Sequence, residues 1–163
     1  MDFPKTVKEY FEDSYRFESK DNRVLKVDDA PDAKEQGQKM VILEKTIFHP
    51  SGGGQPSDTG FMVQNDIKFT VDALAIKDDV ILHIGKFEPS SATFDEGSPV
   101  DCYVDEASRR LHARIHSAGH LLDVAMNLAG RSDLKPGKGY HHQTGAYVEY
   151  IGGVDAGDKD ALV

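Results

Sequence analysis

The pattern of apolar residues changes near Asp105, and this change constrains the fold more than any other feature of the 163-residue sequence. Before it, short runs rich in β-branched residues alternate with polar turns, which is typical of antiparallel strands. After it, apolar residues recur every three or four positions to about residue 129, which is typical of a helix. We therefore expect an α+β fold with a β-barrel-like subdomain in residues 1–104 and a second subdomain in residues 105–163.

Local signals place the expected elements more closely. Asp105 is a plausible N-cap for the helix, and Gly130 can end it. Asn65-Asp66 and Lys77-Asp78-Asp79 are the expected turns of the first subdomain. Residues 135–142, which contain glycine and lysine, are expected to form a loop. Strands are expected in residues 15–19, 39–48, 61–63, 67–74, 80–84, 100–104 and 145–151.

Three histidines, His112, His116 and His120, follow one another at four-residue intervals within the expected helix. A four-residue step returns to nearly the same face of a helix, so the three imidazoles form one stripe. Two histidines one turn apart can hold one zinc ion, although two ligands do not complete a zinc shell. The alternative is a polar helix edge whose histidines make ordinary hydrogen bonds.

A second constraint is the run Gly52-Gly53-Gly54, which lies between Pro50 and Pro56 and is followed by Gln55. Such a segment does not suit the interior of a helix or strand. It is not a phosphate-binding P-loop, because no Gly-Lys-Ser/Thr follows, and its spacing does not fit a dinucleotide fingerprint. The remaining interpretations are a flexible loop, or a loop whose backbone closely approaches a ligand or another segment.

The net charge and the cysteine content exclude some classes of protein. The formal net charge of −9 argues against a general polyanion binder, so any nucleic-acid contact would need a local basic patch or an end. The single cysteine, Cys102, excludes an internal disulfide and is most simply a small buried residue on a strand. No apolar run has membrane-spanning length and no signal peptide is evident, so we expect a cytoplasmic protein without membrane contact.

Taken together, three stretches resemble alanyl-tRNA editing domains. Residues 46–56 resemble their glycine-rich motif, and residues 109–122 resemble their zinc-binding helix. Residues 137–141 and 147–150 resemble the segment that follows this helix. The order of the stretches is most similar to that of the free-standing AlaX editing proteins, in which a barrel-like subdomain precedes a two-layer α/β editing subdomain.

This resemblance implies an activity, a cofactor and a partner. The family hydrolyses the ester that joins a wrong amino acid, serine or glycine, to tRNA(Ala), so the implied partner is the 3′ end of that tRNA. One zinc ion is held by two helix histidines, here His116 and His120, together with a downstream Cys-x-x-x-His. The sequence contains no such motif after residue 120, so the ligand set is incomplete. We therefore expect the N-terminal portion of a longer protein, or a shortened form of one, with weak or absent zinc binding and weak or absent activity in this form.

The resemblance also implies residues that contact the substrate. Gly52, Gly53, Gly54 and Gln55 would line the pocket, and Thr46 would recognise a serine hydroxyl. We expect the glycine-rich segment to lie close to His116 and His120 in space. A non-catalytic tRNA- or metal-binding module and a metal-dependent hydrolase of small esters remain alternatives.

Other residues have two interpretations each. His141 or His142 could substitute for a missing ligand, and His112 is expected on the surface. Asp123 could orient His120 or pair with a basic residue. Exposed cations that could contact tRNA phosphates, or simply be solvated, are Arg131, Lys135 and Lys138.

Overall fold

The computed structural model describes residues 3–31 and 35–153, and the chain divides into two compact units. The first, which we term the barrel unit, comprises Met1–Ser51 and Ser57–Arg109. The second, the helix–hairpin unit, comprises Gly52–Pro56 and Arg110–Val163. The glycine-rich segment thus groups with the second unit, and the predicted subdomain division at residue 104 stays a prediction.

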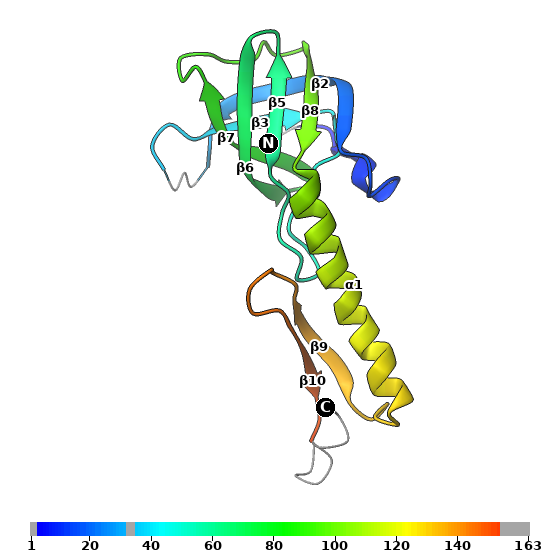
Figure 1. The fold of residues 1–163 in the computed structure, drawn as a ribbon. Coiled ribbons are helices and arrows are strands. Elements are labelled where there is room, and N and C mark those ends of the chain that lie inside the picture. The colour runs from blue at the N-terminus through cyan, green and yellow to red at the C-terminus, as the bar shows by residue number, and fades with distance from the viewer. Residues whose placement is uncertain (1–2, 32–34, 154–163) are drawn as a thin grey trace. The chain divides into compact units, whose positions relative to one another are not determined.

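The barrel unit is a closed barrel of six antiparallel strands (Figure 1). Hydrogen bonding follows the order β2-β3-β7-β6-β5-β8, so no edge of this sheet is left unpaired. The short strands β1 and β4 pair with each other in parallel. The bounds are β1 Val7–Lys8, a 3-10 helix Glu9–Phe11, β2 Glu18–Asp29, β3 Lys39–Leu43, β4 Lys45–Thr46, β5 Gly60–Gln64, β6 Ile67–Lys77, β7 Val80–Glu88 and β8 Pro99–Val104.

Alternation of apolar side chains fills the inside of the barrel. Along β8, Val100, Cys102 and Val104 are buried, whereas the residues between them are more exposed. Phe69 and Phe87 pack with their ring centroids 4.7 Å apart in the same core. Burial raises the pKa of the Cys102 thiol, which agrees with the predicted role of Cys102 as a small core residue.

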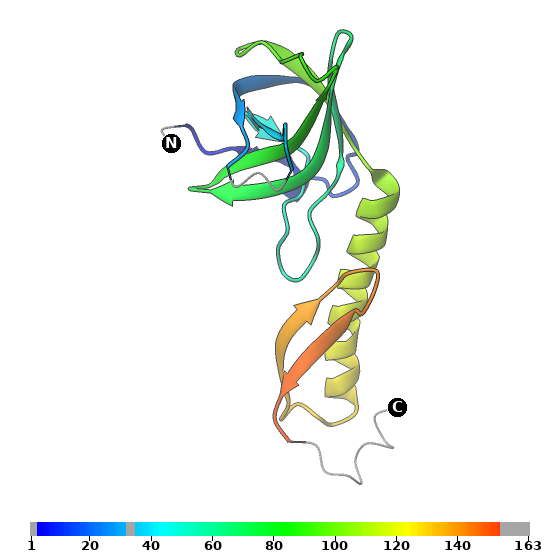
Figure 2. The same ribbon diagram turned by 90° about the vertical axis from the view of Figure 1, so that its left-hand side faces the viewer.

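The helix α1 spans Glu106–Leu128 and begins and ends as predicted. Asp105 Oδ1 accepts a hydrogen bond from the backbone N–H of Ser108 at 3.1 Å, which is an N-cap contact. Gly130 has a φ of +76°, and the N–H of Arg131 donates to the carbonyl of Met126 at 3.0 Å, which closes the C-terminus. After α1, strands β9 Lys135–Tyr140 and β10 Tyr147–Ile151 form an antiparallel hairpin (Figure 2).

The predicted α+β class and antiparallel barrel are therefore confirmed, with three local corrections. Residues 135–140 were expected to be a loop and instead form β9, because β10 supplies their hydrogen-bond partners. Residues 15–17 precede β2 rather than forming a strand. The expected strand 39–48 is interrupted at Glu44. In the described residues, no helix is both long and apolar enough to cross a membrane.

Candidate active site

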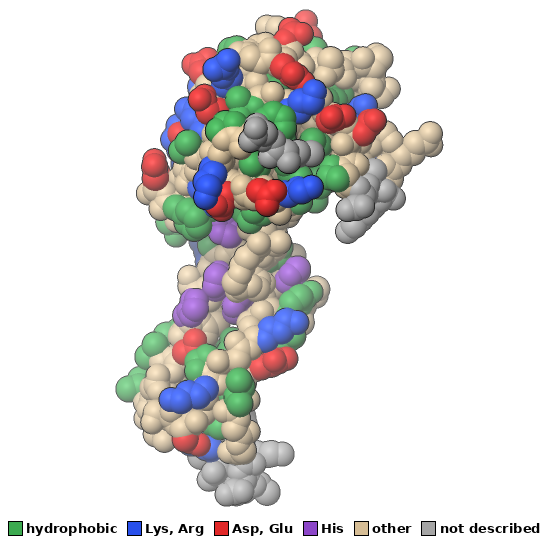
Figure 3. Space-filling model, turned by 180° about the vertical axis from the view of Figure 1, so that it is seen from behind, with side chains coloured by type: hydrophobic (Ala, Val, Ile, Leu, Met, Phe, Trp, Pro, Cys, Tyr) green, Lys and Arg blue, Asp and Glu red, His purple; other side chains and the backbone are tan. Residues whose placement is uncertain are grey.

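The histidine stripe on α1 places His116 and His120 side by side within the helix–hairpin unit. Their ring centroids are 5.0 Å apart and their planes differ by 28°. This arrangement follows from the four-residue spacing, and it is the side-by-side placement that the sequence predicts. Histidine side chains, coloured purple, gather in the view of Figure 3.

The glycine-rich segment meets this helix at His116, in the same unit. The amide oxygen Oε1 of Gln55 lies 3.0 Å from Nδ1 of His116. A Cβ added at Gly53, whose φ is +57°, would lie 3.2 Å from Cε1 of the same ring. A larger residue at position 53 would therefore be strained and would crowd His116. The predicted proximity of the segment to His116 is confirmed.

Gly52 and Gln55 hold the segment in a tight turn. The N–H of Gly52 donates to the carbonyl of Gln55 at 3.1 Å, and the N–H of Gln55 donates to the carbonyl of Gly52 at 2.9 Å. Gly53 and Gly54, with φ values of +57° and +82°, occupy the two positions between them. These positive φ values are accessible to glycine at little cost, which gives the predicted glycine run a structural reason.

The contact with Gln55 determines which nitrogen of His116 carries the proton. The amide oxygen Oε1 can only accept a hydrogen bond, so Nδ1 of neutral His116 is the protonated nitrogen. The lone pair is then on Nε2, the atom that a neutral histidine offers to a metal in this tautomer.

His120 has a comparable neighbour one turn further along α1. Its Nδ1 lies 3.5 Å from Oδ2 of Asp123, and Oδ1 of the same carboxylate accepts a hydrogen bond from the hydroxyl of Tyr150 at 2.7 Å. Burial, together with this bond, raises the pKa of Tyr150 to about 12. The sequence offered His120 or a basic residue as the partner of Asp123, and the contact in the structure is with His120. Tyr150 is a further partner that the sequence did not indicate.

His141, which the sequence offered only as a substitute for a missing ligand, also lies beside His116. Its ring stacks on that of His116 with a centroid separation of 4.6 Å and an interplanar angle of 16°, and its N–H donates to the carbonyl of Gly54 at 2.8 Å. A Cβ at Gly119 would come within 2.4 Å of Cε1 of His141, and one at Gly139 within 2.6 Å of Nε2. Glycines from the loop, the helix and the hairpin therefore surround this imidazole.

The flanks of the glycine-rich segment are held inside the barrel unit. The carboxylate of Asp58 accepts hydrogen bonds from Nε of Arg109 at 2.8 and 3.0 Å and from the N–H of His49 at 2.5 Å. Arg109 also donates to the carbonyls of Ile47 and Ser14, at 2.7 and 2.9 Å. Arg109 and Asp58 are almost fully buried, so this pair fixes the chain on both sides of the glycine-rich segment. Sequence inspection gave no signal for it.

Thr46, the remaining predicted substrate residue, lies in the barrel unit and is fully buried. Its hydroxyl lies 2.8 Å from Nε2 of His83, whose Nδ1 is 3.0 Å from the carbonyl of Val41. Since that carbonyl only accepts, His83 carries its proton on Nδ1, and Thr46 donates to Nε2. Burial lowers the pKa of His83 to about 4, so its neutral form is maintained.

The other predicted residues have less specific surroundings. His112 is half-buried rather than on the surface. Arg131 pairs with Asp133 at 3.1 Å, and Lys135 donates to a backbone carbonyl at 3.4 Å. Lys138 is exposed.

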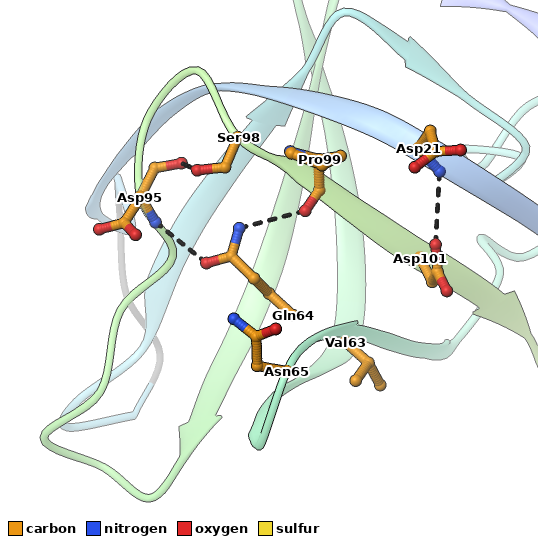
Figure 4. A pocket seen from close by; sticks show the side chains of 8 residues that line it. All are labelled: Asp21, Val63, Gln64, Asn65, Asp95, Ser98, Pro99 and Asp101. Atoms are coloured by element: carbon orange, nitrogen blue, oxygen red, sulfur yellow. Dashed lines mark hydrogen bonds between the residues drawn. The ribbon is translucent and has the colours of Figure 1, made fainter.

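A pocket on the barrel unit is a weaker candidate for a site (Figure 4). Its polar groups bond to one another: Gln64 donates to the carbonyl of Pro99 at 3.1 Å and accepts from the N–H of Asp95 at 3.2 Å. Asp101 accepts from the N–H of Asp21 at 3.3 Å. These contacts join strand ends and turns, so they account for the polar residues without a ligand.

The residues of the helix–hairpin unit fit a zinc ion in part. Two neutral imidazoles, each with its Nδ1 facing an acceptor, are suitable as half of a zinc ligand set. Within residues 3–31 and 35–153, no group of three or more His, Cys, Asp or Glu is arranged to hold a metal ion. The zinc site and the roles of the site residues therefore stay predictions.

Comparisons with known proteins identify the family of the chain. The family model described as tRNA synthetases class II (A) matches residues 2–108. The alanyl-tRNA editing protein AlaX-L of Pyrococcus horikoshii is 33% identical over 117 residues, which cover 72% of this chain and 27% of that protein. Alanine–tRNA ligases of Leptospira borgpetersenii and Methanothrix thermoacetophila are 42% and 38% identical, over 64% and 56% of this chain.

The chain spans about a quarter of the length of AlaX-L and about a tenth of the length of these ligases. The family match covers well over half of the chain and includes the barrel unit almost entirely. The chain therefore belongs to the family of class II alanyl-tRNA synthetases and alanyl-tRNA editing proteins.

Proposed function

We propose that this chain contributes to a zinc-dependent editing site that hydrolyses Ser-tRNA(Ala) or Gly-tRNA(Ala). The observation that supports this most is the hydrogen bond between Gln55 and His116. It joins the two stretches that carry the family resemblance, although they lie 61 residues apart in sequence.

In this proposal His116 and His120 would hold the ion, and further ligands would come from outside the described residues. Zinc bound there would supply a Lewis acid and a water with a pKa of about 7. Gln55 keeps the proton of His116 on Nδ1, and the carboxylate of Asp123, 3.5 Å from Nδ1 of His120, would favour the same tautomer there. Neutral ligands in a fixed tautomer are what zinc requires.

The glycine-rich turn would face the aminoacyl end of the substrate. The N–H groups of Gly52 and Gln55 bond to each other's carbonyls, so Gly53 and Gly54 provide the two N–H groups that this pair does not use. Such groups stabilise negative charge that develops on an ester carbonyl oxygen. Thr46 enters as the residue that recognises a serine hydroxyl. Its proton is donated to His83 and its oxygen already accepts a hydrogen bond from the N–H of Phe48, so only its second lone pair would be left to accept one from the substrate.

The test is a comparison of substrates on a form of the protein that also contains the downstream ligands. We expect deacylation of Ser-tRNA(Ala) or Gly-tRNA(Ala), much slower deacylation of Ala-tRNA(Ala), and loss of activity in His116→Ala. Thr46→Val should reduce activity on the seryl substrate more than on the glycyl substrate, which has no side-chain hydroxyl.

Two alternatives predict different results. A metal-dependent hydrolase of small esters would act on a free aminoacyl ester and not on charged tRNA. A non-catalytic binding module would bind tRNA(Ala) and leave every ester intact. Either outcome would refute the proposed editing activity.

A further inference from the structure

The end of β9 presents its side chains to two opposite faces. His141 points toward α1, where its ring stacks on His116. The residues on either side, Tyr140 and His142, stack on each other with ring centroids 4.0 Å apart and an angle of 7° between their planes. Since successive side chains of an extended segment alternate in direction, these two rings lie on the face away from His141.

Tyr147 extends this stack across the hairpin. It is paired with Tyr140 in the register of β9 and β10, and the ring centroids are 5.5 Å apart with an angle of 18°. Tyr147 retains 41% of its surface exposed. Tyr150 lies on the opposite face of β10, where its hydroxyl contacts Asp123 on α1. The rings of His142, Tyr140 and Tyr147 therefore form a near-parallel stack on the outer face, which we term the aromatic stack.

The charge of the helix–hairpin unit differs from that of the rest of the chain. The helix–hairpin unit, residues 52–56 and 110–163, contains six Lys or Arg and six Asp or Glu. The barrel unit contains 13 Lys or Arg and 22 Asp or Glu. Lys138, two residues before Tyr140 on β9, is exposed. The helix–hairpin unit is therefore formally neutral and the barrel unit is strongly acidic, so the negative charge that would repel a polyanion lies in the barrel unit.

We propose that the aromatic stack binds an unpaired nucleobase at the 3′ end of the tRNA, with the exposed ring of Tyr147 as the stacking surface. This inference rests on the proposed function for the identity of the partner. Single-stranded nucleic acids bind to exposed aromatic rings by stacking, and nearby cations contact the phosphates. The same segment would then place an unpaired nucleobase of the 3′ end on one face and the imidazole of His141 on the other.

The test uses the 163-residue chain and an uncharged acceptor-stem minihelix that ends in the single-stranded 3′ end of tRNA(Ala). Neither zinc nor an aminoacyl group is needed, so the result is independent of hydrolysis. Affinity is measured by fluorescence anisotropy for the intact minihelix and for versions that are abasic at each unpaired position. The protein variants are Tyr147→Leu, Tyr147→Phe and, as a matched control, Tyr15→Leu, which changes an exposed tyrosine of the barrel unit.

We expect Tyr147→Leu to weaken binding roughly 5-fold or more, the effect of losing one stacked base, and Tyr147→Phe and Tyr15→Leu to leave it within about twofold. One abasic position should weaken binding to the wild type and have no further effect on Tyr147→Leu. The other abasic positions should still weaken binding of Tyr147→Leu, which an unfolded variant would not show. The proposal would be overturned if Tyr147→Leu and every abasic position lowered the affinity additively, or if the wild type did not bind the minihelix. The aromatic stack would then only support the hairpin. Coupling here, together with no deacylation by the form that contains the downstream ligands, would uphold this inference and refute the proposed function.

Discussion

Gly119 provides the sharpest test of how the candidate site is packed. It lies inside α1, where alanine is favoured over glycine by about 1 kcal/mol. Considered as a helix position alone, Gly119→Ala should therefore stabilise the protein. The structure predicts the opposite, because the new Cβ would lie 2.4 Å from Cε1 and 3.0 Å from Nδ1 of His141.

The magnitude follows from the confinement of this ring. A Cβ at Gly139 would be 2.6 Å from Nε2 of His141, and one at Gly54 would be 3.1 Å from Cδ2, so both backbones already approach the imidazole closely. Overpacking at such a site costs about 1–3 kcal/mol, which exceeds or cancels the gain in helix propensity. We expect a net loss of roughly 0–2 kcal/mol, and a gain of about 1 kcal/mol when the same change is made in His141→Ala.

The assay is urea unfolding followed by circular dichroism, on the four proteins of this double-mutant cycle. Ala118→Gly, at the exposed neighbouring position, is the matched control and should cost about 1 kcal/mol in either background. Equal stabilisation by Gly119→Ala with and without His141 would show that the ring of His141 does not confine position 119.

Three further predictions concern buried and paired groups. Arg109→Met should lower the free energy of unfolding by about 3–5 kcal/mol, since it leaves the buried Asp58 carboxylate unpaired; a loss below about 1 kcal/mol in a urea titration would contradict this. For His83, whose pKa is lowered to about 4, only the unfolded chain takes up a proton as the pH falls from about 6.5 to 4. Roughly 3 kcal/mol of stability should be lost over that range, and His83→Gln should lack this pH dependence, which thermal melts would reveal. In a zinc-binding form, Asp123→Asn should lower zinc affinity about 10- to 100-fold in chelator competition, with an unchanged affinity counting against its role at His120.

Periodicity was sufficient to predict the elements with strong local signals. The alternation of Val100, Cys102 and Val104 and the three- and four-residue pattern after Asp105 both reflect burial of one face, and the structure confirms them. The turns at 65–66 and 77–79 were likewise predictable, because Asn and Asp tolerate the positive φ values found at Asn65 and Asp78.

Elements that depend on distant partners could not be predicted in this way. β9 contains Pro136, Gly137 and Gly139, which disfavour a strand, and it forms because β10 pairs with it. A signal for His141 was present in Gly119, a glycine inside an otherwise favourable helix, but its meaning depends on the fold that places His141 over it. The pairing of Arg109 with Asp58 likewise depends on tertiary structure and leaves no local pattern.

Metal content is the direct test of whether His116 and His120 are half of a zinc site. Zinc per chain should be measured by elemental analysis for the 163-residue form, for a longer form that contains a downstream Cys-x-x-x-His, and for His116→Ala in that longer form. We predict well below one zinc in the first, one in the second and none in the third, because two imidazoles do not complete a zinc shell. Full occupancy in the 163-residue form, or one zinc retained in His116→Ala, would contradict the assignment.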